Sequence, residues 1–198
     1  MVQAGLRRAD KAPGQISLAV GRRLCQTLAC MEVRAASPDD CHAIAEVHVA
    51  SWQAAYAGIL DAAFLAGLSI DRREESWRQV LSAADSELLL GCEGDSVVGF
   101  ASFGPSRDVD APPRRAELWA LYVHPRCWST GAGRELWRAA YARIRSQAFS
   151  SVSLWVLKDN ARAIRFYSAV GFTVEAGPGK EFELGGTRVC ELRMVLAS

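Results

Sequence analysis

The stretch "YVHPRCWSTGAG", residues 122–133, places a proline and two glycines between an apolar run and a strongly amphipathic segment. The apolar run "AELWALYV" at 116–123 predicts a central buried strand, which Pro125 ends. From Arg134 to Ala148 apolar residues recur at helical spacing, with arginines on the other side. The sequence therefore predicts a strand, a glycine loop and a helix whose free N–H groups can bind an anion.

The anion that suits this loop is a diphosphate. The N–H groups of residues 129–134 are expected to lack intrahelical acceptors, and Gly131 and Gly133 have no Cβ to block a phosphate. The helix dipole contributes only about 0.3–1 kcal/mol, whereas each charge-assisted N–H bond contributes about 1.5–3 kcal/mol. A dinucleotide fingerprint would need glycine where Leu136 stands, and a Walker loop would need lysine where Arg134 stands.

The rest of the chain alternates strands and helices in an order that mixes hairpins with a crossover. Strands are expected at 31–37, 86–92, 97–104, 116–123, 151–157, 172–177, 181–184 and 187–196, and helices at 38–52, 62–81, 134–148 and 160–170. This order predicts an α/β (α+β) fold, with a single-domain mixed β-sheet flanked by helices.

Composition excludes several classes of protein. The chain has 198 residues, 50% of them hydrophobic, and a formal net charge of +1, which gives no overall attraction to nucleic acid or membrane. No apolar run is long enough to span a bilayer. The six cysteines include no C-x-x-C pair, and the three histidines have no metal-ligand spacing. We expect a cytoplasmic protein without nucleic-acid, membrane or metal partners.

Residues 1–30 are arginine-bearing and poor in acids. This composition fits either a cleavable targeting peptide or a disordered N-terminal extension ahead of a domain that starts at Met31. The apolar part is weak and interrupted by Gly21 and Arg22, so the extension is the favoured interpretation, with a domain at 31–198.

Two stretches resemble a known family. "ALYVHPRCWSTGAGRELW" at 120–137, followed by "NARAIRFYSAVGF" at 160–172, is similar to the two main motifs of the Gcn5-related N-acetyltransferases (GNAT). The resemblance extends from Met31 to Leu196. It implies a GNAT-like acyl-CoA N-acyltransferase fold, acetyl-CoA as co-substrate and direct transfer of acetyl to a primary amine.

The resemblance also assigns the cofactor site. The backbone at Leu121, Tyr122 and Val123 would hold the pantetheine arm. The pyrophosphate would be wrapped by Trp128, Ser129, Thr130, Gly131, Ala132, Gly133 and Arg134. Two positions depart from the family pattern: Trp128 replaces a glutamine or arginine at a position mainly used for packing, and Ser129 replaces a frequent glycine.

The second motif supplies Asn160 and Tyr167, nearly two helical turns apart on one helix. The resemblance implies that the asparagine bonds the pantetheine arm and that the tyrosine protonates the departing thiolate. A phenol with a pKa near 10 stays protonated at neutral pH and can donate to a thiolate whose acid has a pKa of about 8.5. The alternative for Tyr167 is an ordinary core aromatic beside Phe166.

Three further residues have two interpretations each. Glu117, on the central strand, is either a base that acts through water, as glutamates on this strand do in relatives, or an ion-pair partner for Arg114 or Arg115. Trp52 and Tyr56, at i and i+4 of a predicted helix, either shape the acceptor pocket or pack it, and packing is favoured for Trp52.

The expected function is N-acetylation of a small-molecule amine. A peptide or protein N-terminal acetyltransferase is one alternative, since an α-amine near pKa 8 is deprotonated at a cost of only about 1.4 kcal/mol, against roughly 4–5 kcal/mol for a lysine-like amine. A non-catalytic acyl-CoA-binding sensor or interaction module is the other. The expected partner is the small-molecule amine, and a homodimer is left open.

Overall fold

The protein is described by a computed structural model that covers residues 31–82 and 87–197. The expectation for residues 1–30 lies outside these residues. Along the chain the elements are β1 Glu32–Ala35, α1 Cys41–Ala55, α2 Ala62–Ala66, α3 Ile70–Ser82, β2 Glu87–Glu93, β3 Ser96–Pro105, β4 Arg115–Val123, α4 Ala132–Ser146, β5 Ser151–Leu157, α5 Ala161–Ala169, β6 Thr173–Val174, β7 Lys180–Leu184 and β8 Thr187–Ala197.

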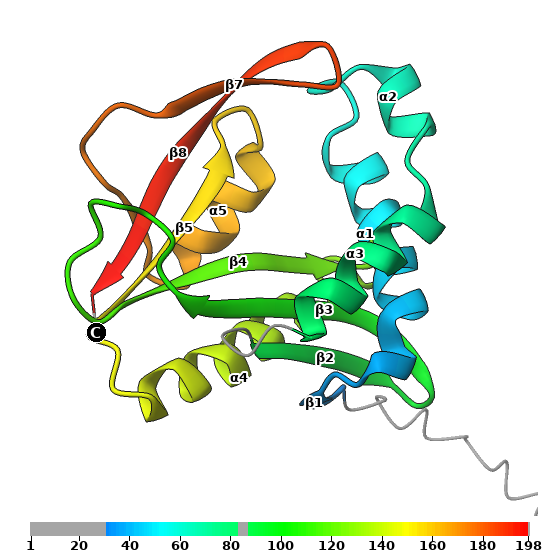
Figure 1. Cartoon of the computed structure of the whole chain (residues 1–198), viewed down its shortest axis with the longest axis horizontal. Helices are drawn as coiled ribbons and strands as arrows, with labels where there is room; N and C mark the ends of the chain where they lie inside the picture. The colour runs from blue at the N-terminus through cyan, green and yellow to red at the C-terminus, as the bar shows by residue number, and fades with distance from the viewer. Residues whose placement is uncertain (1–30, 83–86, 198) are drawn as a thin grey trace, which may run out of the picture.

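The strands form one 8-stranded sheet in the order β1-β2-β3-β4-β5-β8-β6, with β7 paired to β8. The β4–β5 pair is parallel, and every other pair is antiparallel. Figure 1 shows that β4 and β5 start side by side and diverge, and that α1 lies near the end of β4 where the two strands have separated. The predicted mixed sheet flanked by helices is therefore confirmed.

The divergence of β4 from β5 has a local cause. The parallel pairing covers only Arg115 to Glu117, opposite Ser151 to Ser153. On the other edge of β4, the register with β3 shifts so that Trp119 has no partner, which is a β-bulge that bends the strand. Beyond Glu117, the edge of β4 that faces β5 therefore makes no hydrogen-bonded pairs with β5.

The free edge of β4 presents backbone donors. The His124 N–H donates to the carbonyl of Val98 on β3 (2.8 Å). Because successive residues of a strand point their N–H groups to opposite edges, the N–H groups of Leu121 and Val123 point toward β5. These are two of the three backbone positions that the resemblance assigns to the pantetheine arm; the N–H of the third, Tyr122, points toward β3.

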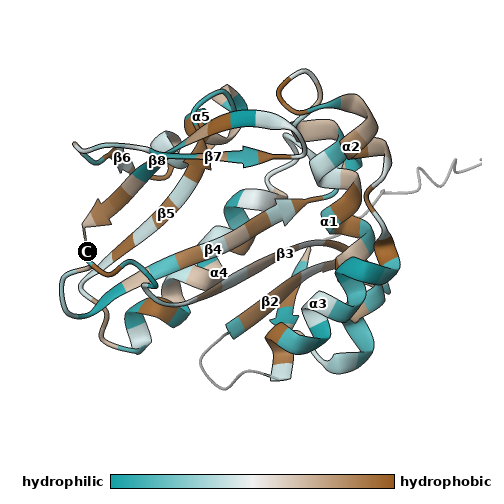
Figure 2. Ribbon diagram, turned by 45° about the horizontal axis from the view of Figure 1, so that its top comes forward, coloured by the Kyte–Doolittle hydropathy of each residue, from teal (hydrophilic) through white to brown (hydrophobic). Residues whose placement is uncertain are grey.

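Helices cover both faces of the sheet. Trp137, Ala140 and Ile144 of α4 pack on one face, and Ile44 and Val47 of α1 pack on the other. Burial on both faces explains the continuous apolar runs of the central strands. In Figure 2 the outer helix α3 is mostly hydrophilic, and it reaches the core through Trp77.

A buried histidine lies behind the site. The Trp77 Nε1–H donates to Nδ1 of His48 (3.0 Å), and the His48 ring stacks on Tyr122 with centroids 5.1 Å apart. Burial lowers the pKa of His48 to about 3, so the ring is neutral at physiological pH. Its role is to support Tyr122 from behind.

The segment between α1 and α2 contains a turn at Gly58 and a helix cap at Asp61. Gly58 has φ +79, and Asp61 caps α2 by accepting a hydrogen bond from the Phe64 N–H (2.8 Å). The first helix starts differently from the prediction, because Pro38–Asp40 forms a 3-10 turn and the α-helix begins at Cys41. Across residues 31–82 and 87–197, no helix has both the length and the apolar character needed to cross a bilayer.

Candidate active site

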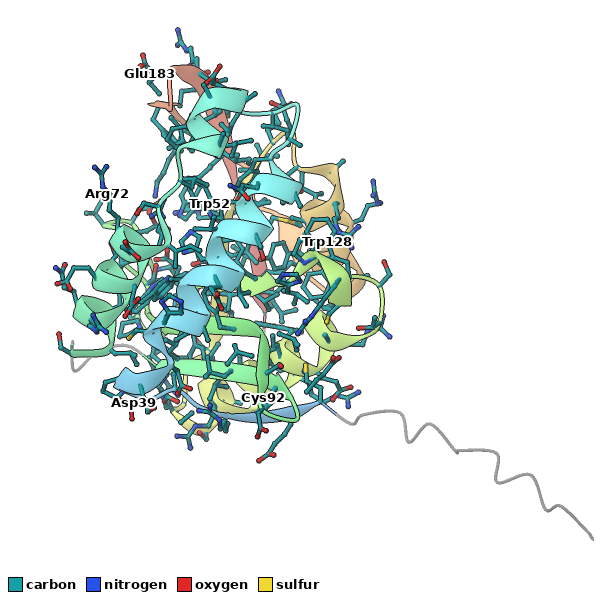
Figure 3. All side chains as sticks on the ribbon, turned by 90° about the vertical axis from the view of Figure 1, so that its right-hand side faces the viewer. Asp39, Trp52, Arg72, Cys92, Trp128 and Glu183 are labelled. Carbon is teal, nitrogen blue, oxygen red and sulfur yellow. The ribbon has the colours of Figure 1, made fainter. Side chains whose placement is uncertain are left out.

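A cavity of about 1040 Å³ occupies the space between the diverging strands β4 and β5. Every residue singled out from the sequence lines it except Ala132, which is buried under the loop. Figure 3 looks onto this side of the molecule, with Trp52 on α1 and Trp128 beside the start of α4. The structure therefore brings residues 52–56, 117–134 and 160–167 to one site.

The glycine loop has the shape of an anion nest. Ser129 and Gly131 have φ values of +64 and +101, on either side of Thr130, whose hydroxyl donates to the carbonyl of Cys127 (2.8 Å). Alternation of this kind turns successive N–H groups toward one concave side. The positive φ of Ser129 also gives a physical reason why glycine suits this position.

The free donors of the loop are fewer than the sequence predicted. The N–H of Arg134 donates to the carbonyl of Gly131 (2.9 Å), so the expectation that this group is free was wrong. The N–H of Trp128 donates to Pro125 (3.2 Å). In the described part of the chain, the N–H groups of residues 129–133 have no backbone acceptor. These N–H groups are the ones left for a ligand.

The two glycines differ in what they require. Gly131, the N-cap of α4, lies at φ +101, and a Cβ there would meet no atom within 4 Å. A side chain would be strained by the backbone and would project into the space that a ligand would occupy. A Cβ at Gly133 would make ordinary contact with Phe166 at 3.4 Å. Gly131 is thus the position where glycine is needed.

Trp128 does more than pack. Its Nε1–H donates to the carbonyl of Val123 (2.7 Å), which also accepts from the Ser51 hydroxyl (2.9 Å). The guanidinium of Arg162 lies 4.0 Å from the centre of the Trp128 ring. The tryptophan therefore ties the end of β4 to the loop and to the start of α5, a set of contacts that the sequence prediction missed.

Three arginines line the cavity near the loop: Arg134, Arg162 and Arg165. Within residues 31–82 and 87–197 none of them forms an ion pair with an acidic side chain. Unpaired guanidinium groups next to free N–H donors suit a polyphosphate. The last two arginines were missed from the sequence, although their i, i+3 spacing on the predicted helix was a usable signal.

Asn160 begins α5. Its Oδ1 accepts a hydrogen bond from the Ala163 N–H (3.1 Å), and the residue is 8% exposed. Because the carbonyl oxygen caps the helix, the amide NH₂ is the group that remains for a ligand in the cavity.

Tyr167 is a core aromatic that also lines the cavity. Its ring packs against Phe166 and Phe172, with centroids 5.3 and 5.8 Å away, and it also lines the cavity. Burial, and to a smaller extent the neighbouring Tyr122, raises the pKa of Tyr167 above that of an ordinary phenol. The hydroxyl is therefore a hydrogen-bond donor across the physiological pH range.

Glu117 is engaged in an ion pair. It is 2% exposed, its Oε2 accepts from the backbone N–H of Arg107 (2.9 Å), and its Oε1 accepts from the Arg107 guanidinium. The proposed partners were wrong, because Arg114 donates to the carbonyl of Ala148 and Arg115 pairs with Glu175 (3.1 Å). Glu117 thus anchors the loop between β3 and β4.

Trp52 and Tyr56 both line the cavity and pack. Their rings meet edge to face at 5.1 Å, within an apolar cluster that includes Leu60 and Leu157. Burial and the adjacent Tyr122 hydroxyl raise the pKa of Tyr56 well above its usual value. The packing of these residues is therefore observed, and their role in shaping the acceptor pocket stays a prediction.

The far end of the cavity was not predicted. It is built by the loop after β3 and by the four strands β4, β5, β7 and β8, and the lining residues there are Arg107, Asp108, Trp119, Trp155, Lys180 and Glu191. Asp108 holds these parts together by accepting hydrogen bonds from Trp155 Nε1 (3.0 Å) and Lys180 Nζ (2.7 Å). These contacts join segments that are far apart in the sequence, so no local sequence pattern predicts them.

The site thus combines a diverging parallel strand pair, an anion nest at its end and a buried tyrosine on the next helix, an arrangement that suits an α/β enzyme with a phosphate-bearing substrate. The sequence matches the acetyltransferase (GNAT) family over residues 52–172. It is 33% identical over 160 residues to the uncharacterized N-acetyltransferase YuaI of Bacillus subtilis (strain 168), an alignment that covers 81% of this chain and 89% of YuaI. The protein therefore belongs to the GNAT family of acetyltransferases.

Two further similarities have informative names. The L-methionine sulfoximine/L-methionine sulfone acetyltransferase of Salmonella typhimurium is 29% identical over 147 residues, which covers 74% of this chain and 82% of that enzyme. The crystal structure of the PaiA N-acetyltransferase from Thermoplasma acidophilum in complex with coenzyme A has a TM-score of 0.68 at 22% identity, covering 85% of this chain and 99% of that one. The second similarity shows the shared fold.

Proposed function

We propose that the protein transfers the acetyl group of acetyl-CoA to a primary amine of a small molecule by direct attack. The observation that carries the proposal is the nest at residues 129–133, whose N–H groups lack acceptors in the described chain and adjoin the unpaired Arg134, Arg162 and Arg165. This donor set fits the diphosphate of coenzyme A. The PaiA structure, which holds coenzyme A on the same fold, supports it.

The chain would divide the work among three parts of the cavity. The loop N–H groups bind the diphosphate, and the N–H groups of Leu121 and Val123 on the free edge of β4 bind the pantetheine arm. Acetyl-CoA supplies an activated thioester. Tyr167, kept protonated by burial, donates to the leaving sulfur. Orientation by these groups lowers the entropic part of the barrier.

The amide of Asn160 provides a test of the pantetheine site. Asn160→Asp keeps a side-chain oxygen for the helix cap but loses the NH₂ donor, so we expect the free energy of unfolding to change by less than about 0.5 kcal/mol while acetyl-CoA affinity falls about tenfold. Asn160→Ala loses the cap as well, at about 1 kcal/mol. Thermal unfolding and calorimetric titration measure the two effects. Unchanged affinity in Asn160→Asp would remove the residue from the cofactor site.

The proposed function is tested by thiol release. Acetyl-CoA is mixed with the protein and a panel of amines that contains small amines, amino acids and peptides with free α-amines, and the acetylated product is identified by mass spectrometry. The proposal expects turnover with small amines. Preference for peptides would favour the N-terminal acetyltransferase, and binding of acetyl-CoA without turnover of any amine would favour a binding module.

A further inference from the structure

Glu191 lies in the middle of β8 on the strand face that borders the cavity. In the sheet it stands opposite Leu157 of β5 and Lys180 of β7. It lines the cavity, as Tyr56 and Tyr122 also do, and its charge acts on the pKa of both tyrosines. The carboxylate therefore shares one cavity with both tyrosines.

Among residues 31–82 and 87–197 the Glu191 carboxylate forms neither a hydrogen bond nor an ion pair, although the charges of Lys180 and Arg107 act on it from a greater distance. Its neighbour across the ladder, Lys180, directs its ammonium group to Asp108 (2.7 Å). Two residues along β8, Arg193 pairs with Asp110 (2.7 Å) and with Glu175. Burial accordingly raises the pKa of Glu191 above that of an exposed glutamate.

The other charged side chains that line this end of the cavity are paired with one another. The two cations that line it are Arg107, which pairs with Glu117, and Lys180, which pairs with Asp108. Glu191 remains as one half-buried negative charge. Since a desolvated charge is stable only when it is paired, this site favours a ligand that brings one positive charge and no negative charge.

Two of the aromatic walls already carry cations of the protein. Arg107 lies 5.0 Å from the centre of the Trp119 ring, and Lys180 lies 3.7 Å from the centre of the Trp155 ring. One face of each indole is therefore already covered by a cation of the protein. The remaining ring surfaces, with Leu157 and Leu184, provide apolar contact for the body of a ligand.

We propose that Glu191 binds the ammonium group of the acceptor, and that the acceptor is a primary amine whose remaining body is apolar and uncharged. This rests on the proposed function, to which it adds the acceptor class. An amino acid would place its carboxylate at an end of the cavity whose two lining cations, Arg107 and Lys180, are already paired. The substrates named for the Salmonella relative are amino acids, so the two chains would differ in acceptor class.

Glu191 would also receive the proton that the amine must lose before it attacks. The ammonium group transfers one proton to the Glu191 carboxylate, the neutral nitrogen forms a bond to the acetyl carbon, and the carbon–sulfur bond breaks. Tyr167 gives its proton to the sulfur and is reprotonated by the second proton lost from nitrogen. Glu191 releases its proton to solvent, so the products are the amide, the free thiol and one proton.

Three acceptors with the full-length protein test the acceptor class: 2-phenylethylamine, L-phenylalanine and L-methionine sulfone, each at saturating acetyl-CoA. L-Phenylalanine has the same body as 2-phenylethylamine plus a carboxylate. We expect kcat/KM for 2-phenylethylamine to exceed that for both amino acids by at least about tenfold, the discrimination that one unpaired buried charge provides. Higher kcat/KM for either amino acid would overturn the proposal and leave the proposed function standing. Turnover of no amine at all would overturn both.

Glu191→Gln tests the residue itself. This variant keeps the shape of the side chain and removes the charge, and we expect kcat/KM for 2-phenylethylamine to fall about 10- to 100-fold while the Kd of acetyl-CoA stays the same. Glu183→Gln, at an exposed position of the neighbouring β7, is the matched control and should behave as the wild type. Circular dichroism establishes that the variants fold. A wild-type kcat/KM in folded Glu191→Gln would refute the assignment.

Discussion

Replacing Gly131 with valine is expected to weaken acetyl-CoA binding about 100-fold, or roughly 2.7 kcal/mol. Gly131 lies at φ +101, where a β-branched side chain is strained by about 1–3 kcal/mol unless the backbone moves. Any such movement turns loop N–H groups away from the diphosphate. Each hydrogen bond lost in this way contributes about 1.5–3 kcal/mol to binding. Isothermal titration calorimetry with acetyl-CoA measures the loss directly.

Gly94→Val is the matched control for this experiment. Gly94 also has a positive φ, +58, and an added Cβ there likewise meets no atom within 4 Å, but it lies in the turn between β2 and β3, away from the cavity. The control should lose stability through the same kind of backbone strain and keep its affinity for acetyl-CoA. Equal affinities in the two variants would show that the loop at residues 129–133 does not hold the diphosphate.

Tyr167→Phe is expected to lower kcat about 100-fold, within the range for a lost general acid. The ring contacts with Phe166 and Phe172 remain, so folding and the Kd of acetyl-CoA should stay within about twofold of the wild-type values. Because burial raises the pKa of the phenol, Tyr167 stays protonated until the carbon–sulfur bond breaks, when it gives its proton to the sulfur. Steady-state thiol release, combined with calorimetry, separates the two effects.

Tyr141→Phe controls for the loss of a hydroxyl. Tyr141 is half-buried on α4, where its ring lies 5.3 Å from that of Trp137, and it is outside the cavity. This variant should keep the wild-type kcat. If Tyr167→Phe also keeps it, the proton reaches the sulfur from elsewhere and Tyr167 is only a core aromatic.

The cofactor end of the site could be predicted from the sequence because its signals are local. The loop from Pro125 to Gly131 and the helix that follows are contiguous, and glycine, proline and helical periodicity each have a direct backbone meaning. The spacing of Asn160 and Tyr167 on one helix is equally local. The pairing of the Arg134 N–H with Gly131 escaped prediction, because whether a first-turn N–H is free depends on how tightly the turn closes.

The acceptor end could not be predicted because it depends on contacts between distant segments. The partner of Glu117 is decided by the path of the loop after β3, which brings Arg107 to the carboxylate in place of its sequence neighbours. Glu191 gave no signal, since one glutamate in an otherwise alternating strand is indistinguishable from an exposed residue. The ion pairs of Arg107, Lys180 and Arg193 with other carboxylates show that Glu191 has no salt-bridge partner among them, and these pairs are visible only in the structure.

A crystal structure of the protein with coenzyme A tests the central claim most directly. We predict diphosphate oxygens within about 2.7–3.2 Å of the backbone nitrogens of residues 129–133, and the thiol beside the Tyr167 hydroxyl. A diphosphate bound elsewhere, with those N–H groups paired to protein atoms, would contradict the account.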